Sequence, residues 1–486
     1  MLPYYPSDQP HTAWLRSVLA HPRRHAKSCL AALVLFSVFC FLWSAGLTSS
    51  LRNTLDYPRN NGLPPLYKEW YELERKLPQH NDSLPYPEGA NGRYFYASNH
   101  VWGLGFNNAL QEQLFLSHLA YISNRSFVFD AYVWDDKTEE PFVQYNGNLI
   151  PSRIPLSAFI AGPTVGAPFG EDEIIPRSVT KEYFQRVCPQ PALIKSDDVN
   201  GLLGTSASAE VMMKAWSDLL RKMPERCVEV GQSNQIFDYM FFGNGDRIIP
   251  FLDDFIRSPV ITHFAWSSLI SSAVANNADL IVEKPTFLQR VFSAWSGSQP
   301  VFNATDYSTS IPGLLAVHVR RGDFEEHCKS LTSWRSGFMG WLQSPILPDH
   351  FYKRDSADHE EPNKLVKDHY AKHCWPTIEQ IVAKIDEVRQ TEEGRGLDRV
   401  YIMTNGPSEW VTELKEKLMW SGVWNRVTSS RELTLNTEQR YVAQAVDMAI
   451  AMRSQVFIGN GFSSLSANVV LLRLSRLFGW RTNRLW

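Results

Sequence analysis

Residues 314–324 are Leu-Leu-Ala-Val-His-Val-Arg-Arg-Gly-Asp-Phe, and this stretch decides the predicted fold. A short apolar run of strand character is followed at once by charged side chains, among them Arg320, Arg321 and Asp323. In open α/β sheets, ligands bind at the carboxyl ends of strands. The planar guanidinium groups could there donate paired hydrogen bonds to a phosphate. The alternative is an arginine–aspartate pair that only braces a turn.

The composition is that of a globular protein. The chain has 486 residues, of which 44% are hydrophobic and 20% charged, and its formal net charge is −3. A chain without excess positive charge has no bulk attraction for nucleic acid, so no nucleic-acid partner is expected.

Residues 29–47 contain no charged side chain and are about long enough to span a bilayer. Arg23, Arg24 and Lys27 precede this run, and only Arg52 follows closely. By the positive-inside rule, residues 1–28 form a cytosolic tail and the rest of the chain after the span is luminal. This topology predicts a single-pass type II membrane protein of the Golgi or the endoplasmic reticulum. A cleaved signal peptide is the alternative.

Four cysteines follow the predicted span, which suggests two disulfides in an oxidising compartment. Three pairings are possible, and proximity in the sequence favours Cys188–Cys227 with Cys328–Cys374. Three N-x-S/T sequons fit glycosylation in the same compartment, at Asn81, Asn124 and Asn303.

The luminal part is predicted to hold a stem and two domains. Residues 48–92 are rich in Pro, Asn and Tyr and are predicted to form the stem. A strand at 93–97, a glycine turn, a helix at 109–122 and a strand at 127–129 form a βαβ unit, with Asn107 or Asn108 as the helix N-cap. The same pattern returns in strands 400–404 and 456–458 and in helices 408–419, 441–452 and 466–477.

The predicted fold class is therefore α/β, with two doubly wound, Rossmann-like domains at 93–300 and 301–486 that face a cleft. A single large α/β domain is the alternative.

Residues 459–466, Gly-Asn-Gly-Phe-Ser-Ser-Leu-Ser, form a turn between a strand and a helix. Unpaired N–H groups and the helix dipole favour an anion at such a position, and Ser463 and Ser464 add hydroxyl donors. The alternative is that these serines only cap the helix. Together with Arg320, the turn suggests a clamp for a diphosphate.

Three other chemistries fit less well. The sequence has no G-x-x-x-x-G-K-[ST] motif, so a P-loop is excluded. The first strand–helix turn carries no cation, unlike the phosphosulfate loop of a sulfotransferase. Asp323 and Glu325 have the spacing of a metal-binding pair, but Arg320 and Arg321 would compete for their carboxylates, so no metal is expected.

Four motifs in register resemble the GDP-fucose protein O-fucosyltransferase superfamily. They are Gly105-Phe106-Asn107-Asn108, residues 318–324, residues 401–405, and Asp447 together with residues 457–466. The resemblance implies a GT-B architecture and an inverting, metal-independent transfer of fucose from GDP-fucose to a hydroxyl of a protein or glycan. The N-terminal domain would then take the acceptor and the C-terminal domain the nucleotide sugar.

The resemblance also implies roles for individual residues. Arg320 would contact the β-phosphate and stabilise the leaving GDP, and His318 would contact the nucleotide or orient Arg320. Asp447 would hold the guanosine. The other donor-binding positions that it implies are Gly105, Asn107, Asn108, Ser463, Ser464 and Leu465.

One departure concerns the general base. Some relatives have a glutamate between the two glycines of the first turn, where this chain has Leu104. Either another group takes the proton, with Glu112 and Asp323 as candidates, or departure of GDP precedes attack and needs little help from a base. Two rival functions therefore stay open: a transferase that uses another nucleotide sugar, and a catalytically silent luminal protein that binds carbohydrate or acts as a scaffold.

Overall fold

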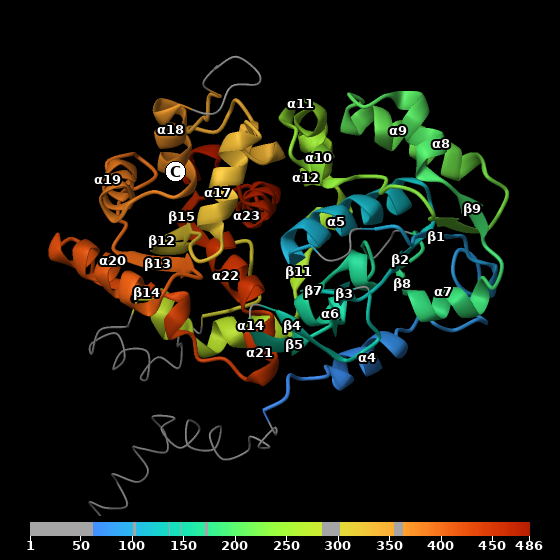
Figure 1. The fold of residues 1–486 in the computed structure, drawn as a ribbon. Helices are drawn as coiled ribbons and strands as arrows, with labels where there is room; N and C mark the ends of the chain where they lie inside the picture. Colours follow the sequence, from blue (N-terminus) through green and yellow to red (C-terminus); the bar gives the residue numbers. More distant parts are fainter. Residues whose placement is uncertain are drawn as a thin grey trace, which may run out of the picture. The chain divides into compact units, whose positions relative to one another are not determined.

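The computed structural model describes residues 62–100, 104–135, 137–145, 147–170, 174–283, 302–353 and 363–486. The chain divides into two units, Met1–Leu63 and Pro64–Trp486, and the elements below belong to the second (Figure 1). The predicted cytosolic tail and the predicted span at 29–47 lie outside the described residues. Within the described ranges, no helix is both long enough and apolar enough to cross a membrane.

The first sheet has five parallel strands in the order β8-β2-β1-β10-β9. Its strands are β1 (Tyr94–Ala97), β2 (Ser126–Phe129), β8 (Val179–Thr180), β9 (Ala192–Ile194) and β10 (Cys227–Val230). The helices of this lobe include α5 (Phe106–Ile122), α7 (Lys181–Val187), α8 (Ser196–Leu203) and α9 (Ala209–Lys222). The predicted first βαβ unit is confirmed by β1, α5 and β2.

The second sheet also has five parallel strands, in the order β14-β13-β12-β15-β16. Its strands are β12 (Ile311–Val319), β13 (Arg399–Thr404), β14 (Arg426–Ser429), β15 (Ser454–Gly459) and β16 (Asn483–Leu485). In chain order this is 3-2-1-4-5, the arrangement of a doubly wound half. The helices of this lobe are α17 (Phe324–Ser333), α18 (Lys364–Cys374), α19 (Ile378–Arg389), α20 (Ser408–Trp420), α21 (Thr437–Tyr441), α22 (Ala443–Met452) and α23 (Ser464–Ser475).

Mostly short elements lie between β2 and β8 and between β10 and β12, and the sequence did not predict them. Three antiparallel pairs join β3 (Tyr132–Val133) to β6 (Arg153–Ile154), β4 (Phe142–Tyr145) to β5 (Asn148–Pro151), and β7 (Ile160–Ala161) to β11 (Ala265–Trp266). The helices here are α6 (Leu156–Phe159), α10 (Tyr239–Phe242), α11 (Gly245–Ile248), α12 (Leu252–Arg257), α13 (Pro259–Thr262), α14 (Ser268–Asn276) and α15 (Ala278–Ile281).

The predicted stem at residues 48–92 overlaps the start of the compact unit. The compact unit begins at Pro64, and α4 (Lys68–Arg75) belongs to it. Tyr67 is buried and its hydroxyl donates to the carbonyl of Glu438 at 2.7 Å, while the Glu74 carboxylate accepts from the backbone N–H of Ser157 at 3.1 Å. The sequence does not show these contacts, because each depends on a partner far along the chain.

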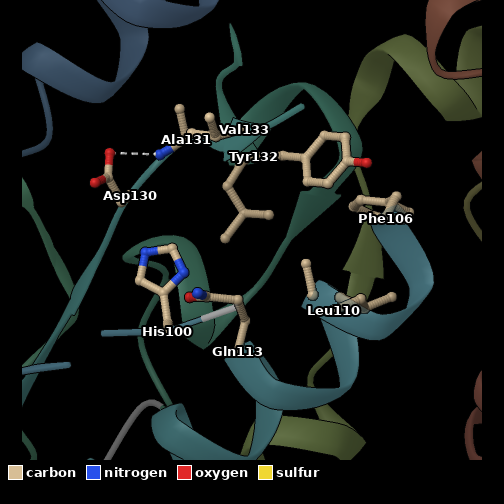
Figure 2. A pocket seen from close by; sticks show the side chains of 10 residues that line it. His100, Phe106, Leu110, Gln113, Asp130, Ala131, Tyr132 and Val133 are labelled. Atoms are coloured by element: carbon tan, nitrogen blue, oxygen red, sulfur yellow. Dashed lines mark hydrogen bonds between the residues drawn. The ribbon is translucent and has the colours of Figure 1, made fainter. Parts of the chain in front are cut away.

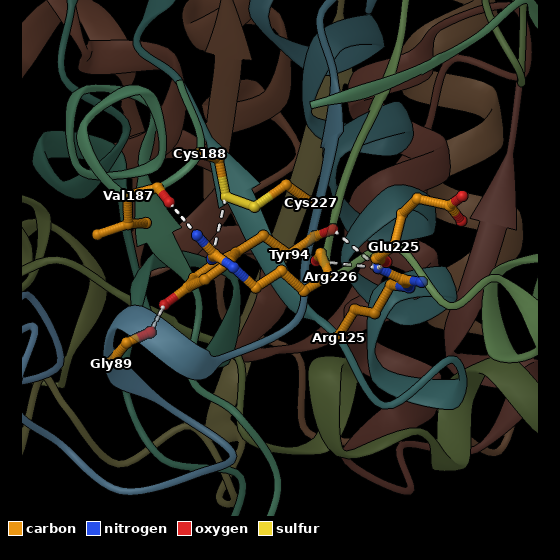
Figure 3. The surroundings of a disulfide bond; sticks show 8 residues. All are labelled: Gly89, Tyr94, Arg125, Val187, Cys188, Glu225, Arg226 and Cys227. Atoms are coloured by element: carbon orange, nitrogen blue, oxygen red, sulfur yellow. Dashed lines mark hydrogen bonds between the residues drawn. A yellow bond between two sulfur atoms is a disulfide. The ribbon is translucent and has the colours of Figure 1, made fainter. Parts of the chain in front are cut away.

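Both predicted disulfides are confirmed. Cys188–Cys227 joins the end of α7 to the first residue of β10 (Figure 3), and Cys328–Cys374 joins α17 to the last residue of α18. Beside the first bond, Arg226 donates to the carbonyl of Val187. Such cross-links persist in oxidising compartments.

The helices that cover the two sheets share one apolar core. Phe95 and Leu114 of the first lobe and Met403 and Leu471 of the second are buried in the same continuous cluster. Helix α5 packs on α23, and α14 packs on α22. The lobes are therefore in direct contact through these helices.

Candidate functional site

Several predicted site residues of the second lobe lie at the carboxyl edge of its sheet. Strand β12 lies between β13 and β15, with Val319 paired to Thr404 and Val317 paired to Ile458. The residues that follow these three strands are therefore neighbours in space, although they lie far apart in the chain, after residues 319, 404 and 459. This edge brings together Arg320, Asn405 and the turn at residues 459–466.

Arg320 is partly exposed and forms an ion pair with Asp323. Its Nη2 lies 3.2 Å from both carboxylate oxygens of Asp323, and its Cζ lies 5.0 Å from the ring centroid of Phe324. The buried Nε of Arg320 has no hydrogen-bond partner among the described residues. The turn-bracing pair is thus present, yet one donor of the guanidinium is still unused. Exposed ion pairs contribute only about 0–1 kcal/mol, so a phosphate could displace this carboxylate at little cost.

Arg321 has a structural role in this fold. It is buried, and its guanidinium lies 4.4 Å from the Trp375 ring centroid and 4.3 Å from that of Trp410. Burial lowers its pKa to about 10, an effect that Glu325 opposes. Its backbone N–H donates to Oδ1 of Asn405 at 2.7 Å. Of the two arginines in the motif, Arg320 is therefore the one available to a ligand.

The turn at residues 459–466 leads into α23 without a side-chain cap. Ser463 is the N-cap residue, and its hydroxyl makes no capping hydrogen bond. Only glycine fits at position 461, because a Cβ there would lie 2.4 Å from the ring of buried Phe338. The first N–H groups of a helix lack partners within the helix. The capping alternative is therefore wrong for Ser463, and the N–H groups at Ser464 and Leu465 keep the geometry of an anion site.

His318 holds this turn against β12. It is buried, and its Nδ1 lies 2.9 Å from Oγ of Ser466, which also accepts from the backbone N–H of Asn460 at 2.9 Å. Burial, followed by the charge of Arg320, lowers the pKa of His318 to about 3, so the imidazole is neutral. In this structure His318 positions the loop, and any contact with a nucleotide stays a prediction.

Replacing Ser466 with alanine is expected to lower the free energy of unfolding by about 1–3 kcal/mol, because it leaves the buried Nδ1 of His318 and the buried N–H of Asn460 unpaired. Urea denaturation of the full chain measures this change. Ser475→Ala is the matched control on the same helix, since that hydroxyl only donates to the carbonyl of Leu472 at 2.8 Å. Equal stabilities of the two variants would contradict the bracing role of Ser466.

Asn107 links the start of α5 to the second lobe. Nδ2 of Asn468 donates to the carbonyl and to Oδ1 of Asn107, at 2.9 and 3.1 Å, and Nδ2 of Asn107 lies 3.5 Å from Oε1 of Gln444. Asn468 is one turn into α23 from Ser464. The starts of α5 and α23 therefore meet, and the carboxyl edges of the two sheets come together there.

The N-cap prediction for α5 is wrong, because Gly105 is the N-cap and both asparagines lie in the first turn. The tertiary partners of Asn107 explain the difference. Gly105 is exposed and Asn108 is half-buried, so both lie near the surface at this start.

Asp447 lies on α22 under the neighbouring strand β13. Its Oδ1 accepts from the hydroxyl of Tyr401 at 2.6 Å. Burial raises the pKa of Asp447 to about 7, and hydrogen bonds from Tyr401 and Ser430 oppose this increase. The carboxyl group is thus held in place within the second lobe, and its role toward guanosine stays a prediction.

The two candidates for the general base are both poorly placed. Glu112 is 1% exposed in the middle of α5. Asp323 is exposed, but it accepts from Arg320 and from Nδ2 of Asn405 at 3.1 Å. Its carboxylate is therefore already engaged by two donors. Leu104 is half-buried, and its carbonyl accepts from Tyr132 at 2.9 Å.

A small pocket opens at the carboxyl edge of the first sheet, beside the first turn of α5 (Figure 2). His100 follows β1 and Asp130 follows β2, and Gln113 points into the pocket from α5. Oε1 of Gln113 is buried without a partner among the described residues. The rest of the lining is mainly apolar: Phe106, Ala109, Leu110, Ala131, Tyr132, Val133 and Leu156.

Sequence reasoning missed several residues that build these two edges. Asn405 was quoted only as part of a motif, and its position at the end of an apolar strand could have marked it. Gln444 and Asn468 sit in ordinary helical sequence, where nothing local signals a contact between lobes. Gln113 has no sequence signal either. Within the described residues, no group of three or more His, Cys, Asp or Glu side chains is arranged to hold a metal.

Comparison with known proteins finds one family that is similar to part of the chain. The family model described as GDP-fucose protein O-fucosyltransferase matches residues 276–474, which include Arg320, Asp447 and the turn before α23. No curated protein sequence matches the chain significantly.

Several solved structures are weakly similar. POFUT1 in complex with GDP is 14% identical with a TM-score of 0.46, covering 81% of this chain and 98% of that one. NodZ alpha-1,6-fucosyltransferase soaked with GDP-fucose is 12% identical with a TM-score of 0.34, covering 78% and 92%. A mutant of Arabidopsis thaliana FUT1 in complex with GDP is 9% identical with a TM-score of 0.35, covering 84% and 73%. These TM-scores are too low to carry an argument about this chain.

The family match covers most of the second lobe, including Arg320 and the uncapped start of α23 at the edge of its sheet. Residues 276–474 of this chain are therefore similar to the GDP-fucose protein O-fucosyltransferase family, and this match supports a glycosyltransferase.

Proposed function

We propose that this protein transfers fucose from GDP-fucose to a hydroxyl group of a protein or glycan, with inversion at the anomeric carbon and without a metal. One observation carries the proposal. Arg320, whose Nε has no partner among the described residues, follows strand β12, and the uncapped start of α23 follows the adjacent strand β15. Both lie inside the residues that match the family.

The proposed role of this edge is to stabilise the leaving group. When the bond between the sugar and the β-phosphate breaks, negative charge develops on GDP. The guanidinium of Arg320 and the N–H groups of Ser464 and Leu465 would meet that charge, with the hydroxyl of Ser463 as a further donor. Preorganised donors of this kind often supply the largest single part of an enzyme's rate enhancement.

The remaining donor contacts are assigned by position. Asp447 would take the guanosine, and Asn107, with Gly105 and Asn108 beside it, would line the sugar–phosphate site from the first lobe. The meeting of the two carboxyl edges at Asn107 and Asn468 supports this assignment. In a GT-B arrangement the acceptor would bind between the lobes, on the side of the first sheet.

We also propose a Golgi or endoplasmic reticulum location, with one N-terminal anchor and a luminal catalytic unit. The two disulfides support an oxidising compartment. The asparagine of each of the three sequons is exposed, which is compatible with glycosylation there: Asn81, Asn124 and Asn303.

Titration calorimetry of the full chain with a panel of nucleotide sugars tests the donor assignment. We expect GDP-fucose to bind, UDP-sugars not to bind, and GDP to be released on incubation with water and a panel of mono- and oligosaccharides. Binding of another nucleotide sugar in place of GDP-fucose would identify a different transferase. Binding without any release of GDP, either to water or to glycan and protein acceptors, would identify a silent carbohydrate-binding protein.

A further inference from the structure

A row of side chains runs from Arg320 along α17. The Arg320 guanidinium lies 5.0 Å from the ring centroid of Phe324, and that centroid lies 5.2 Å from the centroid of His327. The indole of Trp334 follows, with its ring centroid 6.2 Å from that of His327. The imidazole of His327 is thus one aromatic ring away from the cation that is proposed to meet the β-phosphate.

Helix α17, which carries His327, is anchored to the rest of the second lobe. Phe324 and Cys328, on either side of His327, are buried, and Cys328 is bonded to Cys374 of α18. The hydroxyl of Tyr370 on α18 also donates to the carbonyl of Ser336 at 2.9 Å. His327 itself is exposed, and within the described part of the chain its ring makes no hydrogen bond and no ion pair.

The surroundings of His327 lower the pKa of its imidazole, which favours the neutral form that can accept a proton. Partial burial lowers its pKa below the usual histidine value, the charge of Arg320 lowers it further, and Asp323 opposes the shift. The ring is therefore neutral near pH 7 and able to take a proton. Glu112 is buried within α5 and Asp323 is paired with Arg320, so neither competes well for this role.

We propose that His327 is the general base of the transfer reaction, a role that rests on the proposed function. The acceptor oxygen forms a bond to the anomeric carbon while the bond from that carbon to the β-phosphate oxygen breaks. The electron pair of the broken bond leaves with GDP beside Arg320. The proton of the acceptor hydroxyl moves to the free ring nitrogen of His327, which later returns it to solvent.

The His327→Gln variant tests this role, because it keeps a polar side chain and removes the base. We expect its rate of GDP release to fall by about 100-fold, the lower range for loss of a general base. In the wild type, kcat/KM should rise with pH through a value below about 6.5, and this rise should vanish in the variant. His263→Gln, an exposed histidine at the end of α13, is the matched control and should behave as wild type.

Chemical rescue provides a second readout that a merely structural role would not move. In His327→Ala, imidazole added to the buffer should restore part of the lost rate. Full activity with an unchanged pH profile in His327→Gln, or no rescue in His327→Ala, would overturn the proposal. Calorimetry separates this failure from failure of the proposed function: only the latter predicts that the wild type does not bind GDP-fucose.

Discussion

Replacement of Arg320 by alanine is expected to slow GDP release from GDP-fucose by about 10²- to 10³-fold, the usual effect of removing one preorganised donor to developing charge. Arg320 is the cation of the motif that remains available, since Arg321 is buried between Trp375 and Trp410. Loss of an exposed ion pair with Asp323 costs little stability. The variant should therefore fold normally and bind GDP more weakly.

A second variant separates the charge of Arg320 from its hydrogen-bond geometry, and a third serves as a control. Arg320→Lys keeps the charge but loses the paired donors, so its rate should lie between those of wild type and Arg320→Ala. Arg257→Ala is the matched control, because Arg257 is also exposed and its nearest carboxylate is Asp253, at 3.9 Å. Steady-state assays of GDP release measure all three. A wild-type rate in Arg320→Ala would remove Arg320 from the reaction.

The largest expected loss of stability comes from Arg473. This side chain is fully buried on α23 and donates to the carbonyl of Ser454 at 2.6 Å, to Oδ1 of Asn483 at 2.7 Å and to the Thr482 hydroxyl at 2.9 Å. Burial lowers its pKa to about 9, which leaves it charged at neutral pH. Arg473→Met should lower the free energy of unfolding by about 3–5 kcal/mol, because it leaves buried acceptors unpaired.

Urea denaturation measures this loss, and hydrogen exchange should show early opening of β16, whose first residue is Asn483. Arg75→Met is the control. Arg75 is largely exposed on α4, so its replacement should change stability by no more than about 0.5 kcal/mol. A stability close to wild type in Arg473→Met would show that the acceptors find other partners.

The sequence predicts the elements whose apolar pattern is local. Strands β13 and β15 are uninterrupted apolar runs bounded by turns, and each falls within one or two residues of its predicted limits. Helix α20 ends one residue later than predicted, and α23 begins and ends two residues earlier. These elements need no distant partner to be identified.

The elements of the middle segment escape prediction because most are only two to four residues long. Strands such as Tyr132–Val133 and helices such as Leu156–Phe159 are too short to show a period. Their stability comes from contacts between distant residues, such as the ring of Phe106 stacked on that of Phe159 with centroids 3.9 Å apart.

In the candidate site, too, some residues could be predicted from local sequence patterns and others could not. Arg320 and the turn before α23 are visible in the sequence, because a strand end and a glycine–serine turn have local patterns. The partnership of Asn107 with Asn468 depends on how the lobes pack, and the role of His318 depends on Ser466 of a neighbouring strand's turn. His327 lies on a helix face that the sequence marks only as polar.

A crystal structure of the protein with GDP tests the central claim most directly, because it locates the diphosphate. The account predicts the β-phosphate within hydrogen-bond distance, about 3 Å, of the Arg320 guanidinium and of the N–H groups of Ser464 or Leu465. A diphosphate bound in the pocket beside His100 and Gln113, or anywhere away from the carboxyl edge of the second sheet, would contradict it.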